Sequence, residues 1–214
     1  MSTIRRLTAD YYHQALMKHG DTPRGVDWKD SAGQRFRFEQ LLEGLPIDQP
    51  FSILDVGCGT GALVDFLSSR VQKTFRYDGI DFVAGMIEVA ASKHQGRAQT
   101  RFLSTELREI CEKYDFVVSS GIFNVKQTVS TIDWVSHCTE TICEMFERCT
   151  KAIVFNCLTS RVDFRRDELF YSEPGFMLDF CQKNISRYVR INHAYPLFEY
   201  TMTVYREEFI QGKA

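Results

Sequence analysis

Residues 51–61 read Phe51-Ser-Ile-Leu-Asp-Val-Gly-Cys-Gly-Thr-Gly61, an apolar strand that carries an acid at Asp55 and then breaks into three alternating glycines. Directly behind them, residues 62–67 resume an apolar pattern with helical spacing. Strand, glycine turn and helix predict the first βα unit of a doubly wound α/β domain. Glycine is required where backbone passes close to a ligand and turns sharply into a helix N-terminus.

The glycine spacing indicates which kind of ligand this turn accepts. Gly57, Gly59 and Gly61 form G-x-G-x-G, whereas a dinucleotide-binding turn has G-x-G-x-x-G. Asp55 stands two residues before the first glycine. A carboxylate there would repel a pyrophosphate and would suit a cationic ligand.

This combination resembles the first motif of the class I S-adenosylmethionine-dependent methyltransferases. Three further strings of that family follow in the expected order, and the resemblance runs from about Gln34 to Arg206. They are Tyr77-Asp-Gly-Ile-Asp81-Phe-Val-Ala-Gly-Met-Ile-Glu-Val-Ala90, Phe102-Leu-Ser-Thr-Glu106-Leu107 and Tyr114-Asp-Phe-Val-Val-Ser-Ser-Gly121.

The resemblance implies S-adenosyl-L-methionine as the cofactor and assigns residues to it. Asp55 would accept a hydrogen bond from the ammonium group of the cofactor, and Asp81 would accept hydrogen bonds from both ribose hydroxyls. Asp81 would also serve as a helix cap. Glu106 stands where the family has Asp beside the adenine, which is a departure from the family pattern. The expected cofactor residues are Asp55, Gly57, Cys58, Gly59, Gly61, Asp81, Phe82, Met86, Glu106, Leu107, Ser120 and Gly121.

The acceptor side offers fewer signals. Asn124 follows the fourth predicted strand, where it would face the acceptor or cap its own loop. His193 is a candidate general base, since similar bacterial methyltransferases carry a related His-x-Tyr stretch there, although a lone strand histidine is more often structural. Aromatic and basic residues of the first segment would form a lid over the site or pack on the core. The expected substrate-binding residues are Tyr11, Tyr12, Trp28, Arg37 and Tyr195.

Five strand-like runs alternate with helical stretches, and two more strand candidates close the chain. The short connection Tyr195-Pro-Leu-Phe198 forces those last two into an antiparallel pair. We therefore predict a single α/β domain over 1–214, with a doubly wound, mostly parallel seven-stranded sheet, an antiparallel C-terminal hairpin and residues 1–30 as a lid segment. The five runs are 51–56, 76–81, 100–104, 115–120 and 151–157.

Composition narrows the possible partners. A chain of 214 residues with 44% apolar content is large enough for one buried core, and it has no run of ~18 apolar residues that would span a membrane. Seven scattered cysteines without a C-x-x-C pair predict reduced thiols in a cytoplasmic protein, with neither a disulfide frame nor a metal site. A formal net charge of -2 argues against nucleic acid as a partner, because phosphate binding needs a clustered excess of Lys and Arg.

Methyl transfer to an O or N atom of a small-molecule acceptor is the function that these patterns favour. The [DN]-P-P-[YF] and Pro-Cys motifs of DNA-methylating enzymes are absent after the fourth strand. Two other functions stay open: an RNA or protein methyltransferase that uses local basic residues, and a non-catalytic subunit that binds the cofactor. The basic residues are Arg161, Arg165, Arg166, Arg187 and Arg190. The sequence leaves the acceptor, the methylated atom and the oligomeric state open.

Overall fold

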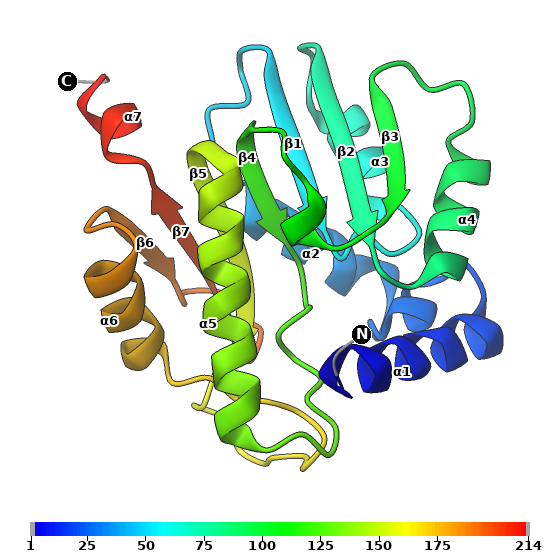
Figure 1. Cartoon of the computed structure of the whole chain (residues 1–214), viewed down its shortest axis with the longest axis vertical. Helices are drawn as coiled ribbons and strands as arrows, with labels where there is room; N and C mark the ends of the chain where they lie inside the picture. Colours follow the sequence, from blue (N-terminus) through cyan, green and yellow to red (C-terminus); the bar gives the residue numbers. More distant parts are fainter. Residues whose placement is uncertain (1–2, 213–214) are drawn as a thin grey trace.

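The computed structural model describes residues 3–212, which fold around a seven-stranded sheet in the order β3-β2-β1-β4-β5-β7-β6 (Figure 1). Strands β1 to β5 run parallel to one another, and β7 is antiparallel to both of its neighbours, β5 and β6. This confirms the predicted fold class, including the terminal hairpin. The strands are β1 (Phe51–Val56), β2 (Phe75–Asp81), β3 (Thr100–Ser104), β4 (Tyr114–Ser119), β5 (Cys149–Leu158), β6 (Val189–Asn192) and β7 (Glu199–Tyr205).

Helices cover both faces of the sheet, as expected for parallel strands that are apolar along their length. Side chains of α2 and α3 pack with one face, and those of α5 and α6 pack with the other. Within residues 3–212, no helix is long and apolar enough to cross a membrane. The helices are α1 (Thr3–His19), the short 3₁₀ turn η1 (Pro23–Val26), α2 (Ser31–Leu42), α3 (Ala62–Arg70), α4 (Ala84–Lys93), the 3₁₀ turn η2 (Leu107–Glu109), α5 (Thr131–Arg148), α6 (Pro174–Asn184) and α7 (Glu207–Gln211).

The site is positioned by the reversal of strand order at β1. This strand pairs with β2 on one side and with β4 on the other, so successive connections leave it in opposite directions. In doubly wound sheets, ligands bind at such a switch point, outside the carboxyl ends of the strands. Helix α1 lies across this edge, beneath the arrowheads of the parallel strands in Figure 1.

The N-terminal segment is more regular than its sequence indicates. Its hydrophobic residues show no clear period, yet it forms the 17-residue helix α1. Leu16 is its one buried residue among those described, so the apolar stripe that would announce an amphipathic helix is nearly absent. The helix is held instead by contacts with η1 and α4, where Leu16 packs with Val83 and Met86.

Candidate functional site

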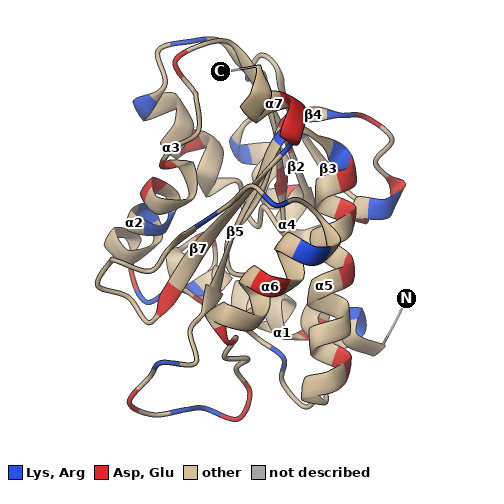
Figure 2. Cartoon of the chain, turned by 90° about the vertical axis from the view of Figure 1, so that its left-hand side faces the viewer, with Lys and Arg blue, Asp and Glu red and all other residues tan. Residues whose placement is uncertain are grey.

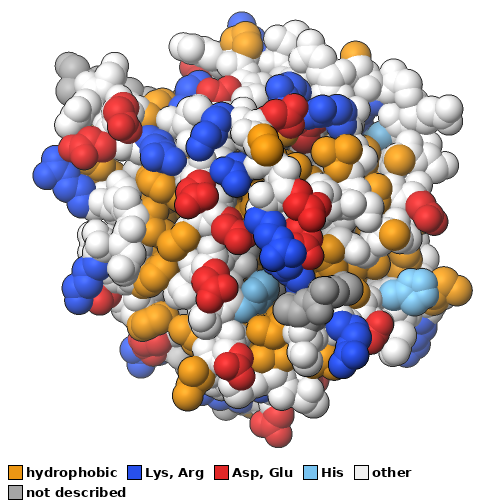
Figure 3. All heavy atoms as spheres, in the orientation of Figure 1, with side chains coloured by type: hydrophobic (Ala, Val, Ile, Leu, Met, Phe, Trp, Pro, Cys, Tyr) orange, Lys and Arg blue, Asp and Glu red, His pale blue; other side chains and the backbone are white. Residues whose placement is uncertain are grey.

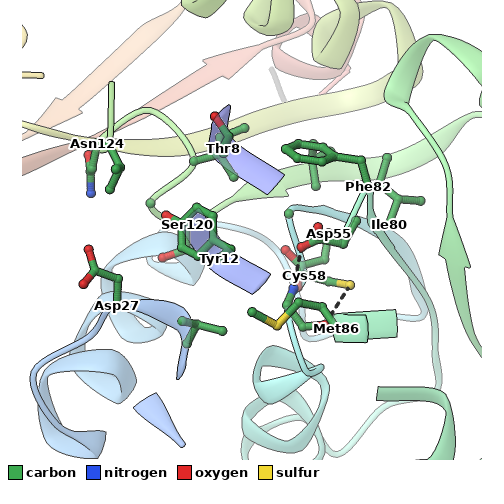
Figure 4. A pocket seen from close by; sticks show the side chains of 18 of the residues that line it. Thr8, Tyr12, Asp27, Asp55, Cys58, Ile80, Phe82, Met86, Ser120 and Asn124 are labelled. Atoms are coloured by element: carbon green, nitrogen blue, oxygen red, sulfur yellow. Dashed lines mark hydrogen bonds between the residues drawn. The ribbon is translucent and has the colours of Figure 1, made fainter. Parts of the chain in front are cut away.

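A cavity of about 360 Å³ lies at the carboxyl edge of the sheet, between the glycine turn and α1 (Figure 4). Its walls come from the ends of β1 to β4, from α1 and α5, and from the segment between η1 and α2. Most residues predicted for cofactor and acceptor therefore share one cavity. Those that line it are Tyr12, Trp28, Arg37, Asp55, Gly57, Cys58, Gly59, Asp81, Phe82, Met86, Glu106, Leu107, Ser120, Gly121 and Asn124.

The glycine turn supplies one wall of the cavity. Gly57, Gly59 and Gly61 have φ angles of 73°, 53° and 79°, a left-handed region that favours glycine. Gly57 and Gly59 line the cavity, but Gly61 does not. A Cβ on Gly61 would come within 2.8 Å of the Phe102 ring, so this third glycine serves the packing behind the turn.

Asp55 lies at the end of β1 and is 4% exposed. The Tyr77 hydroxyl donates to its Oδ2 at 2.7 Å. Burial raises the pKa of Asp55 to about 7, and the hydrogen bond from Tyr77 only partly offsets this. A cationic group in the cavity would favour the ionised form of this carboxyl group.

Asp81 ends β2 on the other side of the glycine turn. Its Oδ2 accepts from the Gly59 amide at 3.1 Å, and its Oδ1 accepts from the Val83 amide at 2.9 Å. Burial raises the pKa of Asp81 to about 6 against the effect of these amides. The carboxyl group thus ties the glycine turn to the start of α4 and also lines the cavity.

Glu106 closes the end of the cavity formed by the β3 loop. It forms ion pairs with Arg5 of α1 and with Arg108, the latter at 2.6 Å. Because both neighbours are cations, the carboxylate of Glu106 is already engaged within the protein. Its contact with Arg5 joins α1 to the edge of the sheet.

The loop after β4 forms the middle of the cavity. The Gly121 amide donates to the Asn156 side chain at 2.8 Å, and Gly121 has a φ of 88°. The Ser120 hydroxyl is buried and has no hydrogen-bond partner among residues 3–212. Because an unpartnered buried hydroxyl is costly, this group indicates a position where a ligand would bind.

A buried ion pair between Arg37 and Glu199 supports the wall of the cavity that Trp28 and Arg37 form. Arg37 lies over the Trp28 ring at 4.1 Å, and its Nε is 2.6 Å from Oε1 of Glu199, although the angle is poor for a hydrogen bond. The Asn156 amide donates to the other oxygen of Glu199 at 3.2 Å. A Cβ on Gly121 would come within 2.7 Å of Trp28. Trp28, Arg37, Glu199, Asn156 and Gly121 thus form a closed ring of contacts, which joins the terminal hairpin to the loop after β4.

Three predicted acceptor-side residues do not line the cavity. His193 is exposed in the connection between β6 and β7, and its ring packs edge-on against Tyr200 with centroids 5.9 Å apart. Tyr195 bonds to Thr201 in the same hairpin, with 3.0 Å between the two hydroxyl oxygens. Tyr11 packs edge-on against Tyr12 at 5.2 Å. His193 therefore lies outside the lining of the cavity, in the terminal hairpin, and its role as a base is not supported by its position.

Other lining residues had no signal in the sequence. Asp27 precedes Trp28 in the segment between η1 and α2, and His137 lies on α5, where burial lowers its pKa. Arg5 reaches the cavity from α1. These residues come from elements far apart in the chain, so no local motif joins them.

The basic run of the long loop between β5 and α6 is paired within that loop. Arg161 bonds to Glu173 at 2.7 Å, and Arg166 forms an ion pair with Glu168. Figure 2 shows basic and acidic residues following one another along this loop. Charges of both signs are also mixed on the face of the molecule shown in Figure 3. Arg165 instead donates to the Ser160 carbonyl group at 3.2 Å and lies over the Tyr171 ring, so acids of the same loop neutralise two of its three arginines.

Comparison with known proteins places the chain in a family. The family model for a methyltransferase domain matches residues 53–142. The chain is 39% identical over 157 residues to Rv1506c of Mycobacterium tuberculosis, a protein provisionally assigned as a methyltransferase, covering 72% of this chain and 93% of that protein. It is 38% identical over 86 residues to the malonyl-[acyl-carrier protein] O-methyltransferase of Acetivibrio thermocellus, covering 39% of this chain and 30% of that protein.

Solved structures share the fold at low identity. One is magnesium protoporphyrin IX methyltransferase of Synechocystis PCC 6803 with bound S-adenosylmethionine (TM-score 0.70, 13% identity, 97% of this chain and 99% of the other). Another is the N-methyltransferase NodS of Bradyrhizobium japonicum WM9 with S-adenosylhomocysteine (TM-score 0.65, 13% identity, 94% and 98%). Fold, glycine turn and relatives together define the class of protein. The chain belongs to the class I S-adenosylmethionine-dependent methyltransferases.

Proposed function

We propose that this methyltransferase binds S-adenosylmethionine along the glycine turn and transfers its methyl group to an O or N atom of a small-molecule acceptor. The observation that carries the proposal is the single cavity in which Asp55 and Asp81 flank the glycine turn, at the switch point of the sheet. Magnesium protoporphyrin IX and acyl-carrier-bound acceptors belong to the relatives named above, and neither is assumed for this chain.

The residues fit this cofactor by their chemistry. Asp55 suits its ammonium group, and Asp81 suits two ribose hydroxyls, because a carboxylate accepts strong charge-assisted bonds. Phe82 and Met86 offer an apolar surface for the adenine, and the unpartnered Ser120 hydroxyl offers a polar contact. Bound there, the cofactor supplies an activated methyl group, so the protein mainly aligns the reactants and excludes water.

The N-terminal segment is proposed to act as the lid of the site. Helix α1 and residues 26–29 contribute lining side chains, including Tyr12 and Trp28. The ion pair between Arg5 and Glu106 and the ring of contacts through Arg37 hold this segment at two separate points. Such a lid would exclude water from the reacting atoms while the acceptor is bound.

Isotope transfer is the direct test of the proposed function. The purified protein is incubated with a metabolite extract and S-adenosylmethionine that carries a ¹³C-labelled methyl group, and labelled products are detected by mass spectrometry. We expect label in one small molecule or one group of related ones. Label found only in RNA or protein, or no label despite tight cofactor binding, would contradict the small-molecule assignment.

Replacement of Asp81 tests the assignment of the ribose site. Asp81→Ala is expected to weaken S-adenosylhomocysteine binding by about 2–4 kcal/mol, because charge-assisted bonds are lost in a partly buried site. Asp81→Asn serves as the matched variant, since its amide oxygen can still accept from the Gly59 or Val83 amide. Titration calorimetry measures both, and a change below about 0.5 kcal/mol would mean that Asp81 only caps the helix.

Cofactor affinity is expected to depend on pH through the two carboxyl groups. In the free protein, the pKa values of Asp55 and Asp81 are raised to about 7 and about 6. Both groups bind the cofactor better when ionised. Affinity for the cofactor should therefore rise as the pH increases through about 6 and about 7, and it should level off at higher pH. Binding at neutral pH should therefore release protons, which calorimetry in buffers of different ionisation enthalpy measures. An affinity that is flat from pH 5 to about 8 would exclude this role.

A further inference from the structure

Asp27 and Asn124 lie together at the end of the cavity away from the predicted cofactor residues. In Figure 4 their side chains point toward a common space on one side of Ser120 and Tyr12. Asp55 and the other labelled cofactor residues lie on the opposite side. Both Asp27 and Asn124 line the cavity. The pair therefore lines the part of the cavity that the predicted cofactor residues leave open.

The backbone holds Asp27 in an uncommon conformation. Its φ of 63° is left-handed, which asparagine and aspartate adopt more readily than other residues with a side chain. Its amide ends η1 by donating to the carbonyl groups of Arg24 and Pro23. Backbone strain of this kind gathers at functional sites because the surrounding structure must maintain it.

The Tyr11 hydroxyl hydrogen-bonds to the carboxyl group of Asp27, which keeps further acceptor positions for a ligand. Within residues 3–212, no Lys or Arg lies within ion-pairing distance of it. Groups facing it are Tyr11 from α1 and Arg166 and Glu168 from the long loop, and Arg166 is already paired with Glu168. Although the residue as a whole is exposed, partial burial raises the pKa of its carboxyl group, and Tyr11 and Arg166 oppose that shift.

Asn124 presents a hydrogen-bond donor to the cavity, whereas the carboxyl group of Asp27 presents an acceptor. Asn124 is 6% exposed, and its Oδ1 accepts from the Leu158 amide at 3.2 Å. Its backbone is fixed as well, because its carbonyl group accepts from the Phe170 amide at 2.8 Å. With the oxygen committed to the protein, the side-chain nitrogen is left as the donor that faces the cavity.

We propose that Asp27 and Asn124 select a hydroxyl group as the methyl acceptor, with Asp27 as the base. This rests on the proposed methyl transfer and names the substrate class for the same cavity. A hydroxyl group satisfies both residues, since it donates its proton toward Asp27 and accepts from Asn124. A carboxylate would be repelled by Asp27, and an ammonium group has no lone pair for Asn124.

The reaction balances with these groups. The acceptor oxygen forms a bond to the methyl carbon, and the carbon–sulfur bond breaks with its electron pair left on sulfur. The electrons of the O–H bond stay on oxygen, and the proton passes to the Asp27 carboxylate. Since Asp27 is exposed as a whole residue, it can release that proton to water.

Binding of matched fluorinated probes tests the inference independently of turnover. Protein saturated with S-adenosylhomocysteine is titrated with 4-fluorophenol, 4-fluoroanisole and 4-fluorobenzoate, followed by ¹⁹F NMR. The phenol should bind about ten-fold tighter than the other two, the effect of one hydrogen bond to a charged group. Carboxyl-detected NMR should also show the pKa of Asp27 lowered by the phenol and unchanged by the anisole.

Two variants sharpen the test. Asp27→Asn keeps the left-handed backbone and should reduce the advantage of the phenol to less than roughly three-fold while benzoate binds more tightly. Asp10→Asn, an exposed residue of α1 outside the cavity, removes the same charge and should change nothing. Affinity for S-adenosylhomocysteine should stay at the wild-type value in both.

The outcomes separate this inference from the proposed function. Failure of the wild-type protein to bind S-adenosylhomocysteine would remove the cofactor assignment and with it this proposal. If the cofactor product binds, then preference for benzoate, an unchanged ranking in Asp27→Asn, or no binding of any probe would overturn the hydroxyl assignment alone. Methyl transfer would then proceed to an acceptor of another class.

Discussion

Replacing Glu199 by alanine is expected to lower the free energy of unfolding by about 3–5 kcal/mol, because the change leaves a buried arginine without its partner. The Glu199 side chain is fully buried, and that of Arg37 is 15% exposed. Asn156 would also lose an acceptor for its side-chain amide. Guanidinium unfolding followed by circular dichroism measures the change.

Two controls show whether the loss of stability comes from the unpaired buried charge. One removes an exposed ion pair, and the other replaces both members of the buried pair. Asp179→Ala removes an exposed i,i+4 ion pair with Lys183 and should cost less than about 0.5 kcal/mol. The double variant Glu199→Leu with Arg37→Met replaces the buried pair by apolar groups and should recover most of the stability. If Glu199→Ala is no more costly than Asp179→Ala, the ring of contacts does not stabilise the fold.

The parts of the molecule that could be predicted are those set by local pattern. Parallel strands are buried on both faces, so apolar runs such as residues 51–56 stand out from their surroundings. The glycine turn, Asp55 and Asp81 follow directly from strand ends, and the switch point brings them together. For these residues the sequence contains both the element and its place in the sheet.

Long-range pairs explain what the sequence did not predict. Arg37 meets Glu199, and Arg5 meets Glu106, only because separate elements converge at one edge of the sheet. Asp27 is exposed and polar, so its sequence context looks like that of an ordinary turn. His193 was predicted from a similar string in related proteins, but the direction of a side chain in a hairpin depends on its register with β7, which no such string specifies.

Gly59→Val is expected to weaken binding of S-adenosylhomocysteine by at least about 100-fold, or ~2.7 kcal/mol, while the domain stays folded. A β-branched residue is a genuine outlier at the φ of 53° found here. Its Cβ would lie 2.9 Å from Cγ1 of Val26, which also lines the cavity. The amide that bonds to Asp81 would therefore shift together with the wall of the site.

Gly96→Val is the matched control, because it places the same side chain at a φ of 78° with no atom within 4 Å of the added Cβ. Gly96 does not line the cavity. Both variants thus carry a comparable backbone strain, of about 1–3 kcal/mol, but only one carries it at the proposed cofactor site. Calorimetry should find lost affinity in Gly59→Val and wild-type affinity in Gly96→Val. Equal affinities in the two variants would mean that the cofactor does not bind along the glycine turn.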